Sequence, residues 1–180
     1  MKYMFTIIAF AYCISLFAQT AGKDNKVSQS ITFHAIPKGA TVSGVFQGRP
    51  PCAGIAGPLH LQLSSNCEKI KCNLTLYRDS VTQQPTTYEL TCIGAGDIIN
   101  QPGGGYRQKI LQGKWSVTTG MPTNSNAEIY KLSTADGSSF LYLLKGDDNV
   151  LFVLDQNKQL MAGDENFSYT LNRVQLVAGK

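Results

Sequence analysis

The sequence lacks an apolar run long enough to favour a membrane-spanning helix, which needs about 20 residues. Its main apolar run, residues 3–17, follows a positive charge at Lys2 and precedes small residues at Ala18 and Ala21. This layout is typical of a secretory signal peptide. We therefore predict that residues 1–18 are a signal peptide cleaved near Ala18. The mature chain is then exported, periplasmic or secreted, with no stable membrane span.

Charge runs and catalytic motifs are also scarce. The chain holds 16 Lys and Arg against 12 Asp and Glu, so removal of Lys2 leaves 15 − 12 = +3. The basic residues are scattered, which disfavours a nucleic-acid partner. With two histidines, His34 and His60, and no G-x-S-x-G, nucleophilic catalysis has little support. We expect no enzyme activity and no cofactor.

Five of the twelve acidic residues lie in three short segments, 147–149, 155–157 and 164–166, each of which also holds an Asn. Asp and Asn tolerate left-handed backbone and hydrogen-bond their own chain, so these segments are typical of turns. A weak calcium site is the alternative interpretation.

No segment shows a sustained helical period. Gly and Pro instead interrupt short runs that alternate or are rich in β-branched and aromatic residues, as strands are. We predict about ten strands in a barrel or a sandwich, after a disordered polar lead-in over residues 19–28. The predicted strands are residues 31–36, 42–46, 59–63, 70–77, 87–93, 109–117, 127–132, 139–144, 150–154 and 167–174.

Four cysteines follow the signal peptide: Cys52, Cys67, Cys72 and Cys92. An even number in an exported chain indicates two disulfides, for which three pairings exist. The sequence holds no C-x-x-C, and neither histidine falls in a ligand-spaced cluster. A zinc site is therefore disfavoured, and we predict no metal ligands.

For one hairpin, the sequence pattern predicts which residues of the two strands lie opposite each other. Residues 80–85 form a loop, and antiparallel pairing about Thr82 places the flanking apolar residues on one face. The opposed pairs on that face are Leu76 with Tyr88, Leu74 with Leu90, and Cys72 with Cys92.

Directly opposed strand residues lie at a spacing that a disulfide spans with modest adjustment. A slip of one residue would separate the cysteines and expose the leucines together. We therefore predict a Cys72–Cys92 disulfide, which leaves Cys52 to pair with Cys67.

Several motifs resemble the NlpE-like envelope proteins in content and order. The first is VFQGRPPCAGI at residues 45–55, which resembles the aromatic–x–G–x–x–P–C stretch and following GI of that family. The later motifs are LYRD (76–79), TTYEL (86–90), GKWS (113–116), AEIYKL (127–132), VLFVLD (150–155) and FSYTLNR (167–173). The resemblance implies a single lipocalin-like β-barrel of about eight to ten strands over residues 29–180 and a role in copper tolerance or envelope stress.

The chain departs from that family at its metal-sensing motif. Cys52-Ala53 leads directly into Gly54-Ile55, so the second cysteine of the family's C-x-x-C is missing. We also expect neither the lipid-bearing cysteine nor the second domain that members of that family carry. The metal-sensing role therefore does not transfer to Cys52.

These observations favour a monomeric, non-enzymatic envelope protein that binds a small apolar ligand inside the barrel or a protein partner. An envelope hydrolase with an unrecognised site is the alternative. We expect Trp115 to close one end of the barrel, and Met121 and Met161 to fill gaps or be exposed rather than bind Cu(I). His34 and His60 are expected to be ordinary strand residues.

Overall fold

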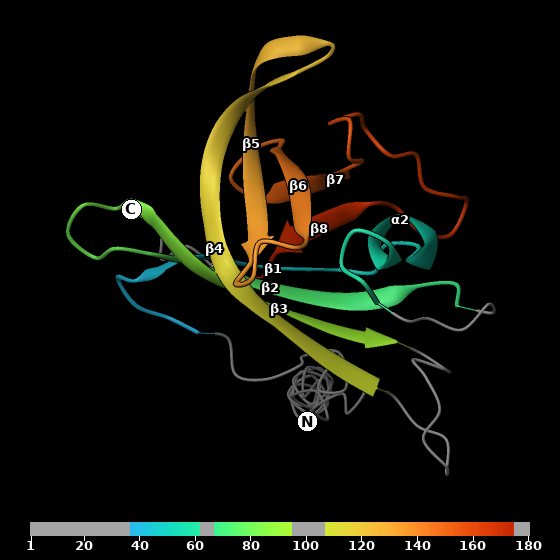
Figure 1. The fold of residues 1–180 in the computed structure, drawn as a ribbon, viewed down its shortest axis with the longest axis horizontal. Helices are drawn as coiled ribbons and strands as arrows, with labels where there is room; N and C mark the ends of the chain where they lie inside the picture. Colours follow the sequence, from blue (N-terminus) through green and yellow to red (C-terminus); the bar gives the residue numbers. More distant parts are fainter. Residues whose placement is uncertain (1–36, 62–66, 95–106, 175–180) are drawn as a thin grey trace, which may run out of the picture. The chain divides into compact units, whose positions relative to one another are not determined.

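Eight antiparallel strands form a closed barrel in which neighbours in sequence pair and β1 closes on β8 (Figure 1). The computed structural model describes residues 37–61, 67–94 and 107–174. The predicted all-β barrel is confirmed. The strands are β1 Val42–Gly48, β2 Ile70–Arg78, β3 Pro85–Gly94, β4 Arg107–Met121, β5 Asn124–Thr134, β6 Phe140–Lys145, β7 Val150–Leu154 and β8 Thr170–Arg173.

Eight of the predicted strands coincide with β1 to β8, with the largest differences in β4, β5 and β8. The predicted signal peptide (1–18), the lead-in (19–28) and the predicted strand at 31–36 lie outside the described residues.

The register predicted for the β2–β3 hairpin is confirmed. Leu76 lies opposite Tyr88, Leu74 opposite Leu90, and Cys72 opposite Cys92. All six side chains are buried, because this register turns the whole apolar face of both strands inward. The loop closes where the carboxylate of Asp79 accepts hydrogen bonds from the backbone N–H groups of the residues two and three positions later.

The strand predicted at 59–63 is wrong over its described part. The chain instead forms a short helix, α2 (Cys52–Ala56), followed by a turn. The N–H of Leu59 donates to the Ile55 carbonyl, and His60 adopts a positive φ of 47°. A turn of this kind buries Leu59 and Leu61 on either side of an exposed His60, so it produces the same alternation as a strand.

β4 is shared between two ladders, and its bend depends on Gly113. The strand pairs with β3 through Lys114 and with β5 from Gly113 onward. A Cβ on Gly113 would lie 1.9 Å from the Ser133 carbonyl oxygen. Only glycine lets the two backbones approach this closely.

The seam between β1 and β8 is short. Its ladder pairs are Phe46 with Arg173 and Gln47 with Asn172. The Arg173 guanidinium donates to the Ser43 carbonyl at 3.2 Å, and its Nε donates to the Asp148 carbonyl. It also lies 4.6 Å from the centre of the Phe46 ring. One side chain therefore ties β8 to β1 and to the β6–β7 turn.

Replacing Gly113 with alanine is expected to lower the free energy of unfolding by about 1–3 kcal/mol, the usual cost of forcing extra volume into a packed site. Urea unfolding followed by the fluorescence of Trp115, the single tryptophan, measures this change. Gly57→Ala is the matched control, because its φ is −60° and nothing lies within 4 Å of the new Cβ. The control should change stability by no more than about 0.5 kcal/mol. Equal changes in the free energy of unfolding of the two variants would show that the close approach at Gly113 does not restrict the side chain at this position.

Candidate functional site

The barrel interior is filled by its own side chains. Every strand contributes to a single cluster of buried residues, and α2 adds Ile55 to it. The Trp115 indole is part of this cluster. It donates to the Tyr77 carbonyl at 2.6 Å and lies 5.0 Å from the Tyr130 ring. The strand contributions are Phe46, Ile70, Cys72, Leu74, Leu76, Tyr88, Leu90, Cys92, Trp115, Leu132, Leu141, Leu143, Leu151, Val153 and Leu171.

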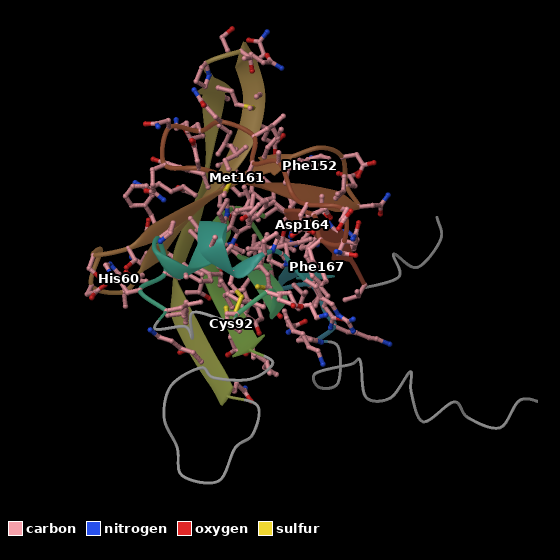
Figure 2. The ribbon with its side chains drawn as sticks, turned by 90° about the vertical axis from the view of Figure 1, so that its right-hand side faces the viewer. His60, Cys92, Phe152, Met161, Asp164 and Phe167 are labelled. Carbon is pink, nitrogen blue, oxygen red and sulfur yellow. A yellow bond between two sulfur atoms is a disulfide. The ribbon has the colours of Figure 1, made fainter. Side chains whose placement is uncertain are left out.

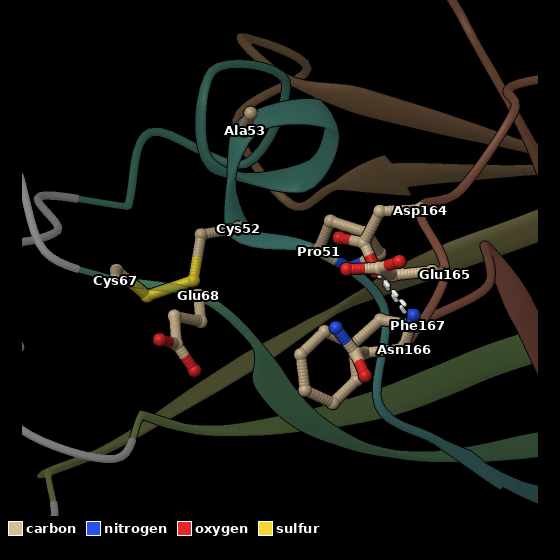
Figure 3. A pocket seen from close by; sticks show the side chains of 9 residues that line it. All are labelled: Pro51, Cys52, Ala53, Cys67, Glu68, Asp164, Glu165, Asn166 and Phe167. Carbon is tan, nitrogen blue, oxygen red and sulfur yellow. Dashed lines mark hydrogen bonds between the residues drawn. A yellow bond between two sulfur atoms is a disulfide. The ribbon is translucent and has the colours of Figure 1, made fainter.

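A pocket of about 830 Å³ lies beside α2, where the connection from β1 to β2 meets the connection from β7 to β8 (Figure 3). The Cys52–Cys67 disulfide forms part of its wall, so this predicted pairing is confirmed. Glu68, Asp164 and Glu165 give the pocket an acidic character.

Contacts within the chain already use part of this pocket. Asp164 accepts hydrogen bonds from the backbone N–H groups of Asn166 and Phe167, at 2.8 and 2.7 Å. The ammonium of Lys69 lies 4.4 Å from the centre of the Phe167 ring. Asp164 is therefore held as a turn cap, which leaves Glu68 and Glu165 as the carboxylates that could meet a ligand.

A contact between α2 and the segment before β8 fixes the wall of this pocket. The Gly54 N–H donates to the Tyr169 hydroxyl at 3.1 Å. A Cβ on Gly54 would lie 2.1 Å from the Met161 methyl and 2.6 Å from the Tyr169 ring. The Met161 side chain thus packs against α2 at this junction and fills a gap, as the sequence predicted.

A second pocket, of about 850 Å³, lies where β4 bends away from β3 toward β5. We call it the bend pocket. It is lined by Tyr77, Thr87, Tyr88, Glu89, Gln112, Gly113, Lys114, Ser133, Thr134, Ala135, Asp136 and Gly137. The sequence analysis missed it, because its residues come from four strands and one turn.

Hydrogen bonds order the acidic groups of the bend pocket. The Gln112 amide donates to Glu89 at 2.8 Å. Asp136 accepts from the Thr134 hydroxyl at 2.6 Å and from both the N–H and the hydroxyl of Ser138. These bonds, the one from Thr134 first, lower the pKa of Asp136 to about 2. Both carboxylates thus have fixed positions on the pocket wall.

Cys72 and Cys92 face each other deep in the core, at 1% and 0% exposure. They are free thiols here, and the hydrogen bond between the Cys72 thiol and Cys92, together with burial, raises the pKa of Cys72 well above its usual value. The structure thus provides the predicted juxtaposition, and the second disulfide stays a prediction.

The candidate metal ligands are not brought together. Met121 packs in a small separate cluster with Ala127, Ile129 and Leu154. His60 is exposed and lies apart from Met161 and Cys92 (Figure 2), and His34 lies outside the described residues. Within residues 37–61, 67–94 and 107–174, no group of three or more His, Cys, Asp or Glu side chains could hold a metal ion.

The acidic segments act as turn caps, as predicted. Asp147 accepts from the N–H groups of Asn149 and Val150, and Asp155 accepts from those of Asn157 and Gln159. These bonds explain the Asp and Asn clusters without a calcium site.

Comparisons with known proteins return no matching family model, no similar curated protein and no similar solved structure. Among the described residues, no helix has the length and apolar character needed to cross a membrane.

Export into an oxidising compartment is expected to join Cys72 and Cys92, because their opposed positions suit a cross-strand disulfide. Peptide mapping of the exported protein under non-reducing conditions should yield Cys52–Cys67 and Cys72–Cys92 peptides. A Cys67–Cys72 peptide would contradict the prediction. Recovery of Cys72 and Cys92 as alkylated thiols after unfolding without reductant would contradict it too.

Asp136 is expected to make stability pH-dependent at low pH. Its folded pKa of about 2 lies below the ordinary 3.8, so its contribution is complete above pH 3.8 and is lost as the pH falls through 2. The difference in urea midpoint between the native chain and Asp136→Asn should shrink over that range. Thr134→Val should raise the Asp136 pKa, as followed by NMR titration. An unchanged pKa would show that the Thr134 hydroxyl does not stabilise the carboxylate.

Proposed function

We propose that this chain is an exported, non-enzymatic β-barrel that works by binding a partner at its outer surface. The setting is the envelope-stress or copper-tolerance role that its resemblance to the NlpE-like proteins implies. The observation that carries this proposal is the filled interior, since inward side chains from every strand form one buried cluster.

A packed core disfavours the internal ligand. Small barrels of about eight strands either fill their interior with side chains or keep room for one small ligand. Here the largest fully buried side chains include Leu74, Leu90, Leu141 and Leu143, which occupy that space. A small apolar ligand would have to displace them, so a protein partner at the surface is favoured.

The α2 end offers an acidic surface for such a partner. The Cys52–Cys67 disulfide and the contact from Gly54 to Tyr169 hold α2 against the segment before β8. Glu68 and Glu165 remain exposed beside this junction. An acidic surface of this kind suits a partner with a basic face.

The hydrolase alternative gains little support from the two pockets. Asp164 and Asp136 are occupied by turn hydrogen bonds, and Glu89 is bonded to Gln112. A general acid or base needs a carboxyl group free to exchange a proton with substrate.

The first test asks whether the barrel holds an apolar ligand. The mature chain is titrated with the fluorescent fatty acid cis-parinaric acid, while energy transfer from the buried Trp115 is recorded. We expect no saturable transfer, because inward side chains from every strand pack into one buried cluster around the indole. Saturable one-to-one transfer would contradict a filled interior and favour an internal ligand.

The second test asks whether the chain contributes to copper tolerance or to the response to envelope stress. A strain that lacks the chain should tolerate copper or detergent stress less well, and the full chain should restore tolerance. A version without residues 2–18 is the matched control and should fail to restore it, because it is not exported. Unchanged tolerance in the deletion strain would contradict the proposed role.

A further inference from the structure

The bend pocket combines the hydroxyl of a mostly buried tyrosine with other polar groups. The Tyr88 side chain is only 2% exposed, yet Tyr88 lines the pocket. No described residue hydrogen-bonds its hydroxyl. The hydroxyl itself is not enclosed, since no side-chain N or O atom of the described residues is both buried and unpaired. A phenol hydroxyl that adjoins a pocket can donate to, or accept from, a ligand atom.

Gly113 explains why Tyr88 reaches this pocket. The two residues are directly opposed in the β3–β4 ladder, and Gly113 has no side chain to cover the ring. Beyond Gly113 the pocket wall continues with Thr134 and Asp136 from the end of β5 and the turn after it. The bend that closes the barrel therefore also creates the opening.

The remaining groups offer both hydrogen-bond donors and acceptors. The ammonium of exposed Lys114 has no partner among residues 37–61, 67–94 and 107–174. Glu89 receives the Gln112 amide on one carboxylate oxygen, Oε2, which leaves acceptor capacity on the other. Tyr77 adds a half-buried aromatic ring.

The charges limit the class of ligand. An anion would meet the carboxylates of Glu89 and Asp136, and a cation would meet the ammonium of Lys114. A wholly apolar ligand would remove water from the Lys114 ammonium and the Tyr88 hydroxyl without offering either a partner, at a cost in binding free energy. A neutral ligand with many hydroxyl groups avoids each penalty, since every hydroxyl both donates and accepts.

We propose that the bend pocket binds a neutral saccharide of one or two sugar units. A sugar hydroxyl accepts from Tyr88 or Lys114 and donates to Glu89, and the apolar face of the ring lies on Tyr77. A volume of about 850 Å³ falls in the range of small-molecule sites. This binding does not depend on the role in envelope stress.

The test is saturation-transfer NMR and calorimetry on the mature chain with glucose, maltose and N,N′-diacetylchitobiose. Glucuronate and glucosamine serve as charged comparisons. We expect at least one neutral sugar to bind, and to bind more tightly than both charged sugars. No binding by any neutral sugar, or preferred binding of a charged one, would overturn the proposal.

Substitutions locate the site. Tyr88→Phe should weaken binding about threefold to tenfold, the effect of one lost hydrogen bond. Lys114→Met should weaken it at least about tenfold, as expected for a hydrogen bond from a charged donor. Tyr77→Ala should abolish detectable binding, whereas Tyr77→Phe should retain it.

Tyr130→Phe is the matched control for Tyr88→Phe, because it removes a hydroxyl from another core-packed ring outside the pocket. Its affinity should equal that of the native chain. Circular dichroism and urea unfolding confirm that each variant is folded. Equal affinity in folded Tyr88→Phe, Lys114→Met and Tyr130→Phe would overturn the assignment to this pocket.

Discussion

The close approach of β4 to β5 at Gly113 is the constraint on which the barrel depends. The first part of β4 pairs with β3 and its second part pairs with β5. At Gly113, where the two ladders meet, the Ser133 carbonyl oxygen lies too close to leave room for a Cβ atom. Because the strand bends here, inward side chains from both halves of the barrel meet in one cluster. The same bend places Trp115 where its indole reaches the Tyr77 carbonyl across β3. Closure, core packing and the bend pocket thus have a common origin.

Local patterns predicted the parts of the fold that depend on neighbouring residues. The alternation of Leu74, Leu76, Tyr88 and Leu90 was sufficient for the β2–β3 register, since one register alone buries all four. The same kind of alternation failed at Leu59 and Leu61, where a turn with a left-handed His60 gives an identical pattern. Sequence periodicity records which side chains are buried, and different backbones can produce the same burial.

The bend pocket could not be predicted, because nothing in the sequence states that Tyr88, Gly113 and Asp136 meet. Each had an ordinary local interpretation, as a strand residue, a glycine or a turn residue. Their juxtaposition follows from two ladders that share β4. The disulfide end differs, since Cys52 and Cys67 were paired from the hairpin register by elimination. A site built from residues far apart in the chain can therefore be predicted from the sequence only where a local motif determines the register of its strands.

The β1–β8 seam gives the molecule a preferred place to open. Two ladder pairs, one guanidinium and the hydrogen bond from the Val174 N–H to the Val45 carbonyl close it, whereas the β3–β4 ladder runs over eight pairs. Backbone amides of β8 should therefore exchange with solvent by local fraying, while those of β3 and β4 exchange only when the whole barrel opens. A pulling force on the C-terminus would likewise peel β8 from the barrel before it disturbed the packed centre.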